Sequence, residues 1–200
     1  MIQLLVSRFL LALTSLPSSR PAPAILSLAN VSANMKYGNI VVMGVAGCGK
    51  SSVGRLLAEA IGARFIEGDS FHPPENIQRM RAGIPLGDDD RAGWLANLAA
   101  QLRQGRDSGE PLVLACSALK RRYRDVLRDG DPGLRFVHLY GDKALIAERM
   151  RERSGHFMPE SLLDSQFRDL EAPGADESAI PCDVSLPPEA LLPRILAELG

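Results

Sequence analysis

One glycine-rich octapeptide constrains the fold of this 200-residue chain more than any other feature. Residues 44–51 read Gly-Val-Ala-Gly-Cys-Gly-Lys-Ser, which fits the pattern GxxxxGK[ST]. This segment follows a short β-branched apolar run, Asn39 to Gly44, and precedes the helical spacing of Ser51 to Ile61. A loop that joins a buried strand to a helix in this way turns successive backbone N–H groups inward, where they hold phosphate oxygens.

Two side chains of the octapeptide add chemistry to this backbone cradle. Lys50 places a positive charge at the β- and γ-phosphates, and the Ser51 hydroxyl can ligate the Mg²⁺ that bridges them. The alternative is a glycine-rich turn that binds nothing, but the complete pattern in its strand-to-helix context favours nucleotide binding. Cys48 could act as a redox switch, although a small side chain in a backbone cradle is the favoured interpretation. The predicted nucleotide-binding residues here are Gly44, Val45, Ala46, Gly47, Cys48, Gly49, Lys50, Ser51 and Ser52.

The composition excludes several classes of protein. The 46% of apolar and 24% of charged residues are typical of a globular chain. A net charge of −1 argues against a nucleic-acid partner, because a dedicated nucleic-acid binder shows a basic excess. The apolar run Phe9 to Leu13 is far shorter than the roughly 20 residues that span a membrane. Three cysteines without CxxC spacing indicate a reduced protein, so we predict a cytoplasmic location and no membrane partner.

Residues 1–34 differ in composition from the rest of the chain. They are rich in Leu, Ser, Ala and Pro, and no acidic residue occurs before Glu59. Three interpretations compete: a start codon upstream of the true one at Met35, an organellar presequence, and an ordered functional arm. The first two both predict a leader-like, disordered extension outside the core, followed by one domain over residues 36–200.

Strand-like and helix-like segments alternate along that domain. This alternation predicts an α/β fold in which a parallel five-stranded sheet has helices on both faces, giving three layers. The predicted strands are 39–44, 64–67, 112–116, 134–140 and 180–184. The predicted helices are 51–61, 74–81, 90–104, 119–128, 143–153, 160–170 and 188–199.

The reaction class follows from acidic residues that are present or absent at strand ends. The strand 112–116 ends in Cys116 and Ser117, without the second acidic Mg²⁺ ligand of large motor-type ATPases, and no Asn-Lys-x-Asp guanine signature occurs. Asp69 instead follows the strand 64–67, at the sheet edge where ligands bind in parallel sheets. A carboxylate there can orient or deprotonate an attacking hydroxyl, although it could also cap the next helix.

Several separate motifs, in order, resemble the small bacterial-type gluconokinases. These are P-loop carbohydrate kinases with a fold like that of nucleoside-monophosphate kinases. The resemblance runs from about residue 38 to the C-terminus, with departures at Cys48, Arg79 and Gly93, where Ser, Lys and Pro are common. The matching segments are 44–51, Gly68–Pro73, Asn76–Leu95, Cys116–Asp125, Gly155–Phe157, Gln166–Glu171 and Pro173–Glu177.

The resemblance implies an enzyme that transfers the γ-phosphoryl group of ATP to the 6-hydroxyl of D-gluconate with the help of Mg²⁺. It implies a P-loop kinase fold with a mobile lid around residues 149–160, and family members often form dimers, so a homodimer is also implied. The catalytic residues are then Lys50 and Asp69, Ser51 is the metal ligand, and Arg149 and Arg153 of the lid meet the phosphates. For an anionic polyol the candidate substrate-binding residues are Asp69, His72, Arg79, Lys120, Arg124 and His156.

Alternatives remain open for several of these residues and for the substrate. His72 could cap the helix that begins near Pro74, and Arg79 and Arg124 could be exposed helix-face charges. We expect Trp94 to be a core anchor, and we expect Asp88 to Asp90 to form a solvated loop with an N-cap at Asp90. The rival functions are a shikimate- or nucleotide-directed kinase of the same fold and a nucleotide-binding regulator without catalysis.

Overall fold

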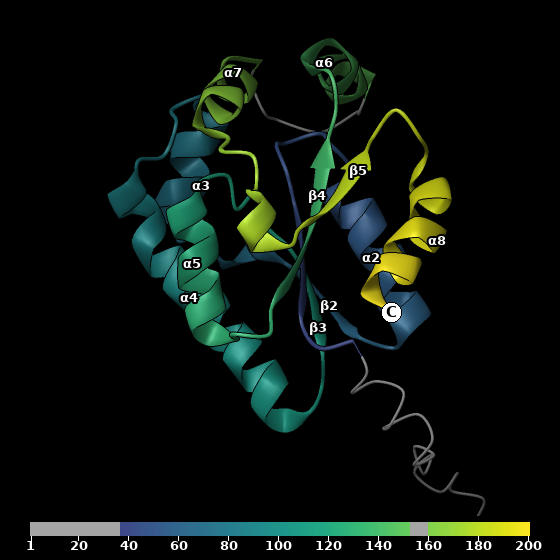
Figure 1. The fold of residues 1–200 in the computed structure, drawn as a ribbon. Coiled ribbons are helices and arrows are strands. Elements are labelled where there is room, and N and C mark those ends of the chain that lie inside the picture. The colour runs from purple at the N-terminus through teal and green to yellow at the C-terminus, as the bar shows by residue number, and fades with distance from the viewer. Residues whose placement is uncertain (1–36, 153–159) are drawn as a thin grey trace, which may run out of the picture.

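The computed structural model describes residues 37–152 and 160–200 (Figure 1). The predicted leader, residues 1–34, lies outside this part of the chain, as do Arg153, His156 and most of the predicted lid. Within the described ranges, no helix is both long enough and apolar enough to cross a membrane.

Five parallel strands form the central sheet, as the sequence predicts. They are β1 (Ile40–Met43), β2 (Arg64–Glu67), β3 (Leu112–Ala115), β4 (Arg135–Tyr140) and β5 (Ile180–Asp183). The order across the sheet is β2-β3-β1-β4-β5. Strand β1 is therefore central, with Val42 paired to Ala115 of β3 on one side and to Val137 of β4 on the other.

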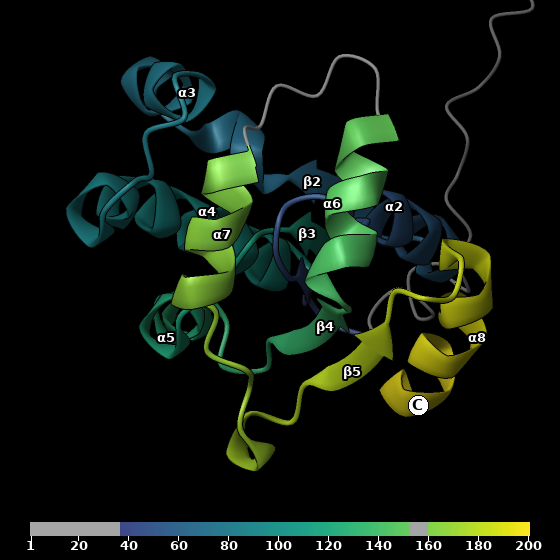
Figure 2. The same cartoon turned by 90° about the horizontal axis from the view of Figure 1, so that it is seen from above.

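Helices cover both faces of this sheet and its carboxyl edge (Figures 1 and 2). Helices α2 (Lys50–Ile61) and α8 (Pro188–Leu199) cover one face, and α4 (Asp88–Ser108) and α5 (Arg121–Gly130) cover the other. Helices α6 (Lys143–Glu152) and α7 (Glu160–Asp169) lie beyond the ends of the strands, and α3 (Pro74–Arg81) lies beside α4.

The alternation of side chains along β1 explains the two hydrophobic cores. Ile40 and Val42 point into the core under α2 and α8, whereas Val41 and Met43 point into the core under α4 and α5. All four residues are completely buried. A strand with both faces covered must be apolar at every position, which is how the run was recognised in the sequence.

The starts of two helices differ from the prediction by two residues, and both helices also extend further at their C-terminal ends. Helix α4 begins at Asp88 rather than Asp90, and the N–H of its N-cap Gly87 donates to Oδ2 of Asp90 at 2.7 Å. Asp90 thus binds the N-cap backbone from inside the first turn instead of being the N-cap. Helix α5 begins at Arg121 because Lys120 is extended, with φ −96° and ψ 147°. Two short 3-10 helices, Gly68–Phe71 and Ala175–Glu177, were not predicted.

Arg124 of α5 is a structural residue. Its side chain is 1% exposed, and Nε and Nη2 donate to the two carboxylate oxygens of Glu177 at 2.6 and 2.7 Å. Its Nη1 donates to the backbone oxygens of Ala118, Leu119 and Glu171. We therefore withdraw Arg124 as a substrate-binding candidate, because its guanidinium is fully used in joining α5 to the segment that follows α7.

We predict that Glu177→Gln destabilises the fold by about 3 kcal/mol, because it leaves the buried Arg124 guanidinium without its counter-ion. The hydrogen bonds from Arg124 hold the pKa of Glu177 at about 2, below its ordinary value of 4.5. The stability that this charge contributes is therefore present above pH 4.5 and is lost as the pH falls towards 2. Urea unfolding at pH 7, 4 and 3 measures both the loss and its pH dependence.

Asp176→Asn is the matched control for this prediction. Asp176 is the neighbouring residue and pairs with Arg121, but both side chains are more than half exposed. Exposed ion pairs contribute little, so the control should unfold close to the wild-type urea concentration. Equal changes in the free energy of unfolding for the two substitutions would contradict a special contribution of the buried Arg124–Glu177 pair to stability.

Candidate active site

The loop between β1 and α2 needs glycine at three positions. Gly44, Gly47 and Gly49 have φ values of 140°, 80° and 98°, in the left-handed region that other residues rarely adopt. A Cβ atom on Gly47 would also lie 2.4 Å from Cγ of Met150 in α6. Gly49 is the N-cap of α2, whose first turn carries no acidic residue, so the positive end of the helix is open to an anion.

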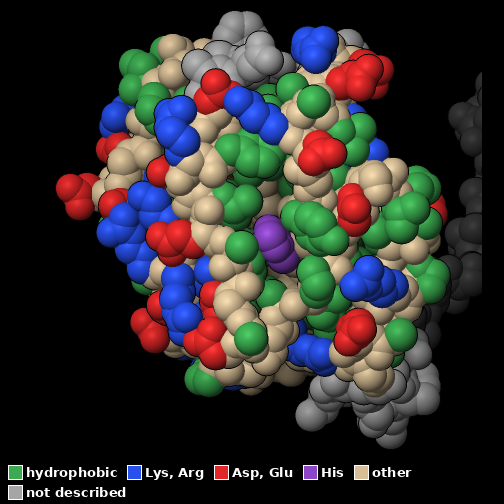
Figure 3. All heavy atoms as spheres, turned by 45° about the horizontal axis from the view of Figure 1, so that its top comes forward, with side chains coloured by type: hydrophobic (Ala, Val, Ile, Leu, Met, Phe, Trp, Pro, Cys, Tyr) green, Lys and Arg blue, Asp and Glu red, His purple; other side chains and the backbone are tan. Residues whose placement is uncertain are grey.

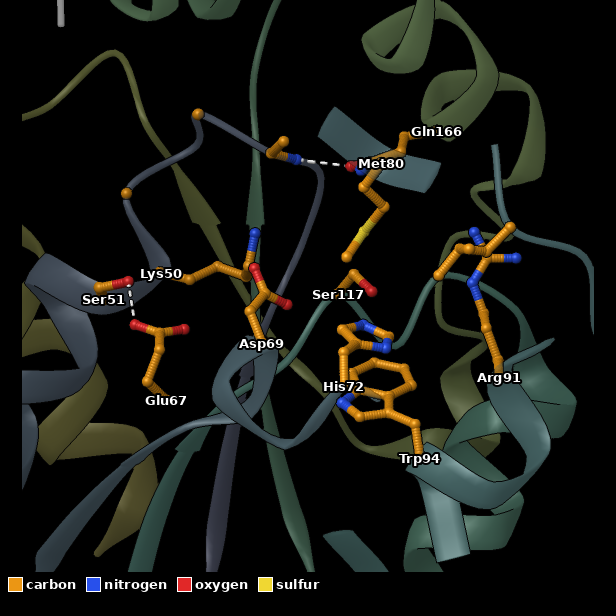
Figure 4. Close-up of a pocket in the computed structure, with 14 residues that line it drawn as sticks. Lys50, Ser51, Glu67, Asp69, His72, Met80, Arg91, Trp94, Ser117 and Gln166 are labelled. Carbon is orange, nitrogen blue, oxygen red and sulfur yellow. Dashed lines mark hydrogen bonds between the residues drawn. The ribbon is translucent and has the colours of Figure 1, made fainter. Parts of the chain in front are cut away.

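Lys50 folds back over this loop. Its Nζ donates to the backbone oxygen of Val45 at 2.9 Å, and the N–H of Ala46 donates to Oε1 of Gln166 at 2.6 Å. Figure 4 shows this bond from Ala46 to Gln166, a residue of α7. The loop is thus held from within by Lys50 and from across the pocket by α7, a contact that sequence reasoning did not identify.

Ser51 has a carboxylate partner that the sequence analysis also missed. Its hydroxyl donates to Oε2 of Glu67, the last residue of β2, at 2.6 Å. The only signal in the sequence was the position of Glu67 two residues before Asp69 on the same strand end. The described residues contain no group of three His, Cys, Asp or Glu side chains that could hold a metal ion. A hydroxyl beside one carboxylate fits Mg²⁺ well, because Mg²⁺ in kinases is held mainly by phosphates and water.

A cavity of about 280 Å³ opens beside the loop (Figure 4). It brings together residues from the loop, the end of β2, the first 3-10 helix, α3, α4 and α7. Its lining residues are Ala46, Gly47, Gly49, Lys50, Ser51, Glu67, Asp69, His72, Met80, Leu86, Arg91, Trp94, Ser117 and Gln166.

Asp69 and His72 both reach this cavity from the segment after β2. Neither caps α3, whose first turn has no side-chain cap, so both capping alternatives are wrong. The His72 ring stacks on Trp94 with 4.2 Å between ring centres and 14° between planes. Its Nδ1 is buried without a hydrogen-bond partner in the described chain, and burial lowers the pKa of His72, which favours the neutral ring.

Trp94 is a core anchor, as predicted, and it also supports the site. It is 1% exposed, and its Nε1 donates to the backbone oxygen of Gly68 at 2.8 Å. This bond ties α4 to the start of the 3-10 helix that carries Asp69. The stacking against His72 then makes the indole a rigid backing for a residue that lines the cavity.

The cations around the cavity are not equivalent. Arg79 is paired with Asp90 at 2.6 Å, and Lys120 with Asp88 at 3.1 Å and Asp169 at 3.7 Å, and neither lines the cavity. Arg91, which sequence reasoning did not single out, does line it. Its Nη1 donates to the Tyr123 hydroxyl at 3.2 Å and lies 3.9 Å from Asp169, with the side chain 11% exposed.

Asp88 neutralises several cations on this side of the molecule. It accepts hydrogen bonds from Tyr123, Lys120 and Arg122. The bond from Tyr123, which is the largest cause, the bond from Lys120 and the charges of Lys120 and Arg122 lower the pKa of Asp88 to about 2. Figure 3 shows basic and acidic side chains interspersed on the side of the molecule where α4 and α5 lie. Asp88 and Asp90 are thus engaged in ion pairs, and all three aspartates at residues 88–90 lie in the first turn of α4.

A second cavity of about 260 Å³ adjoins the other side of the loop. Apart from the loop, Ser52 and Arg149, its walls are apolar, which suits the flat base of a nucleotide. Arg149 therefore lies beside the loop, whereas Arg153 and His156 are outside the described residues and stay predictions. The lining residues are Gly47, Cys48, Gly49, Ser52, Val53, Arg149, Val184, Leu186, Pro187, Pro188 and Leu191.

Comparison with known proteins gives matches over most of the chain. The shikimate kinase family model matches residues 46–172. A gluconokinase from Gluconobacter oxydans is 46% identical over 157 residues, which cover 78% of this chain and 88% of that protein. A gluconokinase structure from Sinorhizobium meliloti has a TM-score of 0.75 and 53% identity, over 82% of this chain and 91% of its own. An unliganded sugar kinase from Janibacter has a TM-score of 0.79 and 49% identity, over 81% and 94%.

Proposed function

Because the chain belongs to the gluconokinase family, we propose that it transfers the γ-phosphoryl group of ATP to the 6-hydroxyl of D-gluconate. One observation supports this proposal above the others: a single cavity joins the phosphate loop to Asp69 and to Arg91. A phosphoryl donor, a proton acceptor and a cation for a carboxylate are what the phosphorylation of a sugar acid requires.

The nucleotide binds along the loop between the two cavities. The backbone N–H groups of residues 44–51 and the N-terminus of α2 hold the phosphates, and the base packs against the apolar wall of the second cavity. Lys50 leaves the backbone oxygen of Val45 and offsets the negative charge on the β- and γ-phosphates. Arg149, which lines the second cavity, adds positive charge, and the resemblance implies the same role for Arg153.

Asp69 receives the proton of the attacking hydroxyl. The 6-hydroxyl oxygen forms a bond to the γ-phosphorus as the bond from that phosphorus to the ADP oxygen breaks. The hydroxyl proton passes to the Asp69 carboxylate, and His72, which lines the same cavity, is the candidate partner for another substrate hydroxyl. Ser51 and Glu67 would hold Mg²⁺, which supplies positive charge to the phosphates when it is bound.

Arg91 is the cation that we assign to the substrate carboxylate. A carboxylate is bound best by a guanidinium, which offers parallel N–H donors. Arg79 and Lys120, the candidates from the sequence, are held by aspartates at 2.6 and 3.1 Å outside the cavity. Arg91 lines the cavity, and its carboxylate partner Asp169 is more distant, at 3.9 Å. His156, in the predicted lid, is a further candidate to cover the substrate.

We predict that the purified chain releases ADP from MgATP in the presence of D-gluconate and that the sugar acid gains a phosphate. A coupled assay with gluconate, shikimate, nucleoside monophosphates and buffer alone checks this, with NMR of the product to place the phosphate. Turnover of shikimate or a nucleotide without turnover of gluconate would overturn the proposed substrate. ATP binding without turnover of any of them would favour the regulator.

We predict that Asp69→Asn lowers kcat by about a hundredfold to ten-thousandfold, because the amide cannot take the hydroxyl proton. MgATP affinity, measured by calorimetry, should stay close to that of the wild type, since the phosphates are held by the loop. Glu67→Gln is the matched comparison on the same strand end and should act on Mg²⁺ dependence instead. An Asp69→Asn variant with wild-type kcat would remove Asp69 from the mechanism.

We predict that Arg91→Gln raises the KM for gluconate by about 10- to 100-fold, the cost of losing one hydrogen-bonded charge pair. The KM for MgATP should change little. Arg79→Gln tests the alternative cation in the same assay, and its exposed pairing with Asp90 leads us to expect a much smaller effect. A large KM effect in Arg79→Gln with none in Arg91→Gln would reverse the assignment.

A further inference from the structure

The peptide group between Val45 and Ala46 is held at both ends. Its oxygen accepts from Lys50 Nζ at 2.9 Å and from the N–H of Cys48 at 3.4 Å. Its N–H donates to Oε1 of Gln166 at 2.6 Å. Val45 is 2% exposed and Ala46 is 8% exposed, whereas Lys50 and Gln166 are half-buried and line the cavity, so the peptide group is shielded more than its side-chain partners are.

The planarity of the peptide bond links these two ends. In a trans peptide the N–H and the C=O point in opposite directions in one rigid plane. Fixing the direction of the Ala46 N–H therefore fixes the direction of the Val45 oxygen. That oxygen is the atom that closes the turn towards Cys48 and receives Lys50.

Gln166 comes to this peptide from a distant part of the chain. It lies 120 residues after Ala46 in sequence, on α7, and it lines the same cavity as Lys50 and Asp69. Three residues further along α7, on the same side of the helix, Asp169 contacts Lys120 at 3.7 Å and lies 3.9 Å from Arg91. The helix therefore contacts the phosphate loop with one residue and the cations beside the substrate end of the cavity with another.

We propose that Gln166 is a positioning residue for Lys50: it sets the plane of the Val45–Ala46 peptide, and this plane sets where the Lys50 amine lies before ATP binds. The role rests on the phosphate-loop function proposed above. Without the Gln166 oxygen the peptide is free to rotate, the Val45 oxygen turns away, and Lys50 loses its resting partner. Reorganising the loop when the phosphates bind then costs free energy, which weakens the binding of ATP.

Gln166→Leu removes the acceptor at nearly constant size, and it is tested first without nucleotide. We expect hydrogen exchange at the Ala46 amide to quicken by about tenfold or more, which corresponds to the loss of one hydrogen bond. The Val41 amide in β1 is the internal reference, because faster exchange there would report loss of the whole fold. We also expect acetylation of Lys50 in the nucleotide-free protein to quicken.

Gln166→Glu and Gln101→Leu are the two matched controls. The carboxylate of Gln166→Glu can accept the same bond, so the Ala46 amide should stay protected from hydrogen exchange. This expectation holds even if the added negative charge weakens phosphate binding. Gln101 lies on α4 and lines neither cavity, so Gln101→Leu should match the wild type in every measurement. Gln166→Asn, shorter by one methylene group, replaces Gln166→Leu if the latter does not fold.

With nucleotide, Gln166→Leu should bind MgATP about tenfold more weakly while the KM for gluconate stays near the wild-type value. Unchanged Ala46 exchange and unchanged Lys50 acetylation in Gln166→Leu would overturn the proposal. A tenfold rise in the KM for gluconate would also overturn it, since that rise indicates direct contact between Gln166 and the substrate. If the wild-type chain does not phosphorylate gluconate, the proposed substrate is wrong. The measurements without nucleotide still test the role of Gln166 in that case.

Discussion

The hydrogen bonding of β1 on both of its edges is the constraint on which the rest of the structure depends. Its backbone pairs with β3 and β4, and the bond from the Cys116 N–H to the Val42 oxygen continues the pairing beyond β3. The glycine loop therefore leaves the middle of the sheet, where the strand ends on either side flank it. Because the sheet is parallel, Glu67 at the end of β2 and Ser117 after β3 arrive at the same edge. The cavity beside the loop is a consequence of this strand order.

Charge pairing then decides which groups remain to act on a substrate. Asp88, Asp90 and Asp169 form ion pairs with Arg79 of α3, with Lys120 just before α5 and with Arg122 of α5. Arg91 has the Tyr123 hydroxyl at 3.2 Å and the Asp169 carboxylate at 3.9 Å, so it is paired less closely than Arg79 or Lys120 and it lines the cavity. The acidic residues around the site thus select among cations that look equivalent in the sequence. In the core, the buried carboxylate of Glu177 likewise pairs with the Arg124 guanidinium, which is therefore not available to a substrate.

The parts of the site that follow from local pattern were predictable, and the parts made by distant pairs were not. The loop, its flanking strand and helix, and Asp69 at a strand end are each visible in a short window of sequence. Ser51 with Glu67, Ala46 with Gln166 and Arg91 with Tyr123 join residues 16, 120 and 32 positions apart. Arg124 was misjudged for the same reason: an arginine on a helix looks exposed until its buried partner, 53 residues away, is known. Asp90 was misplaced because one turn of helix start is ambiguous when three aspartates are consecutive.

The indole of Trp94 joins the hydrophobic core to the cavity. It is nearly inaccessible to solvent, yet it holds the backbone that precedes Asp69 and forms the surface on which His72 lies flat. A smaller side chain at this position would therefore disturb ligand recognition as well as packing. Solvent exposure is thus a poor guide to which positions natural variation can alter without consequence for substrate choice. In this protein one side chain, Trp94, belongs both to the hydrophobic core and to the wall of the cavity.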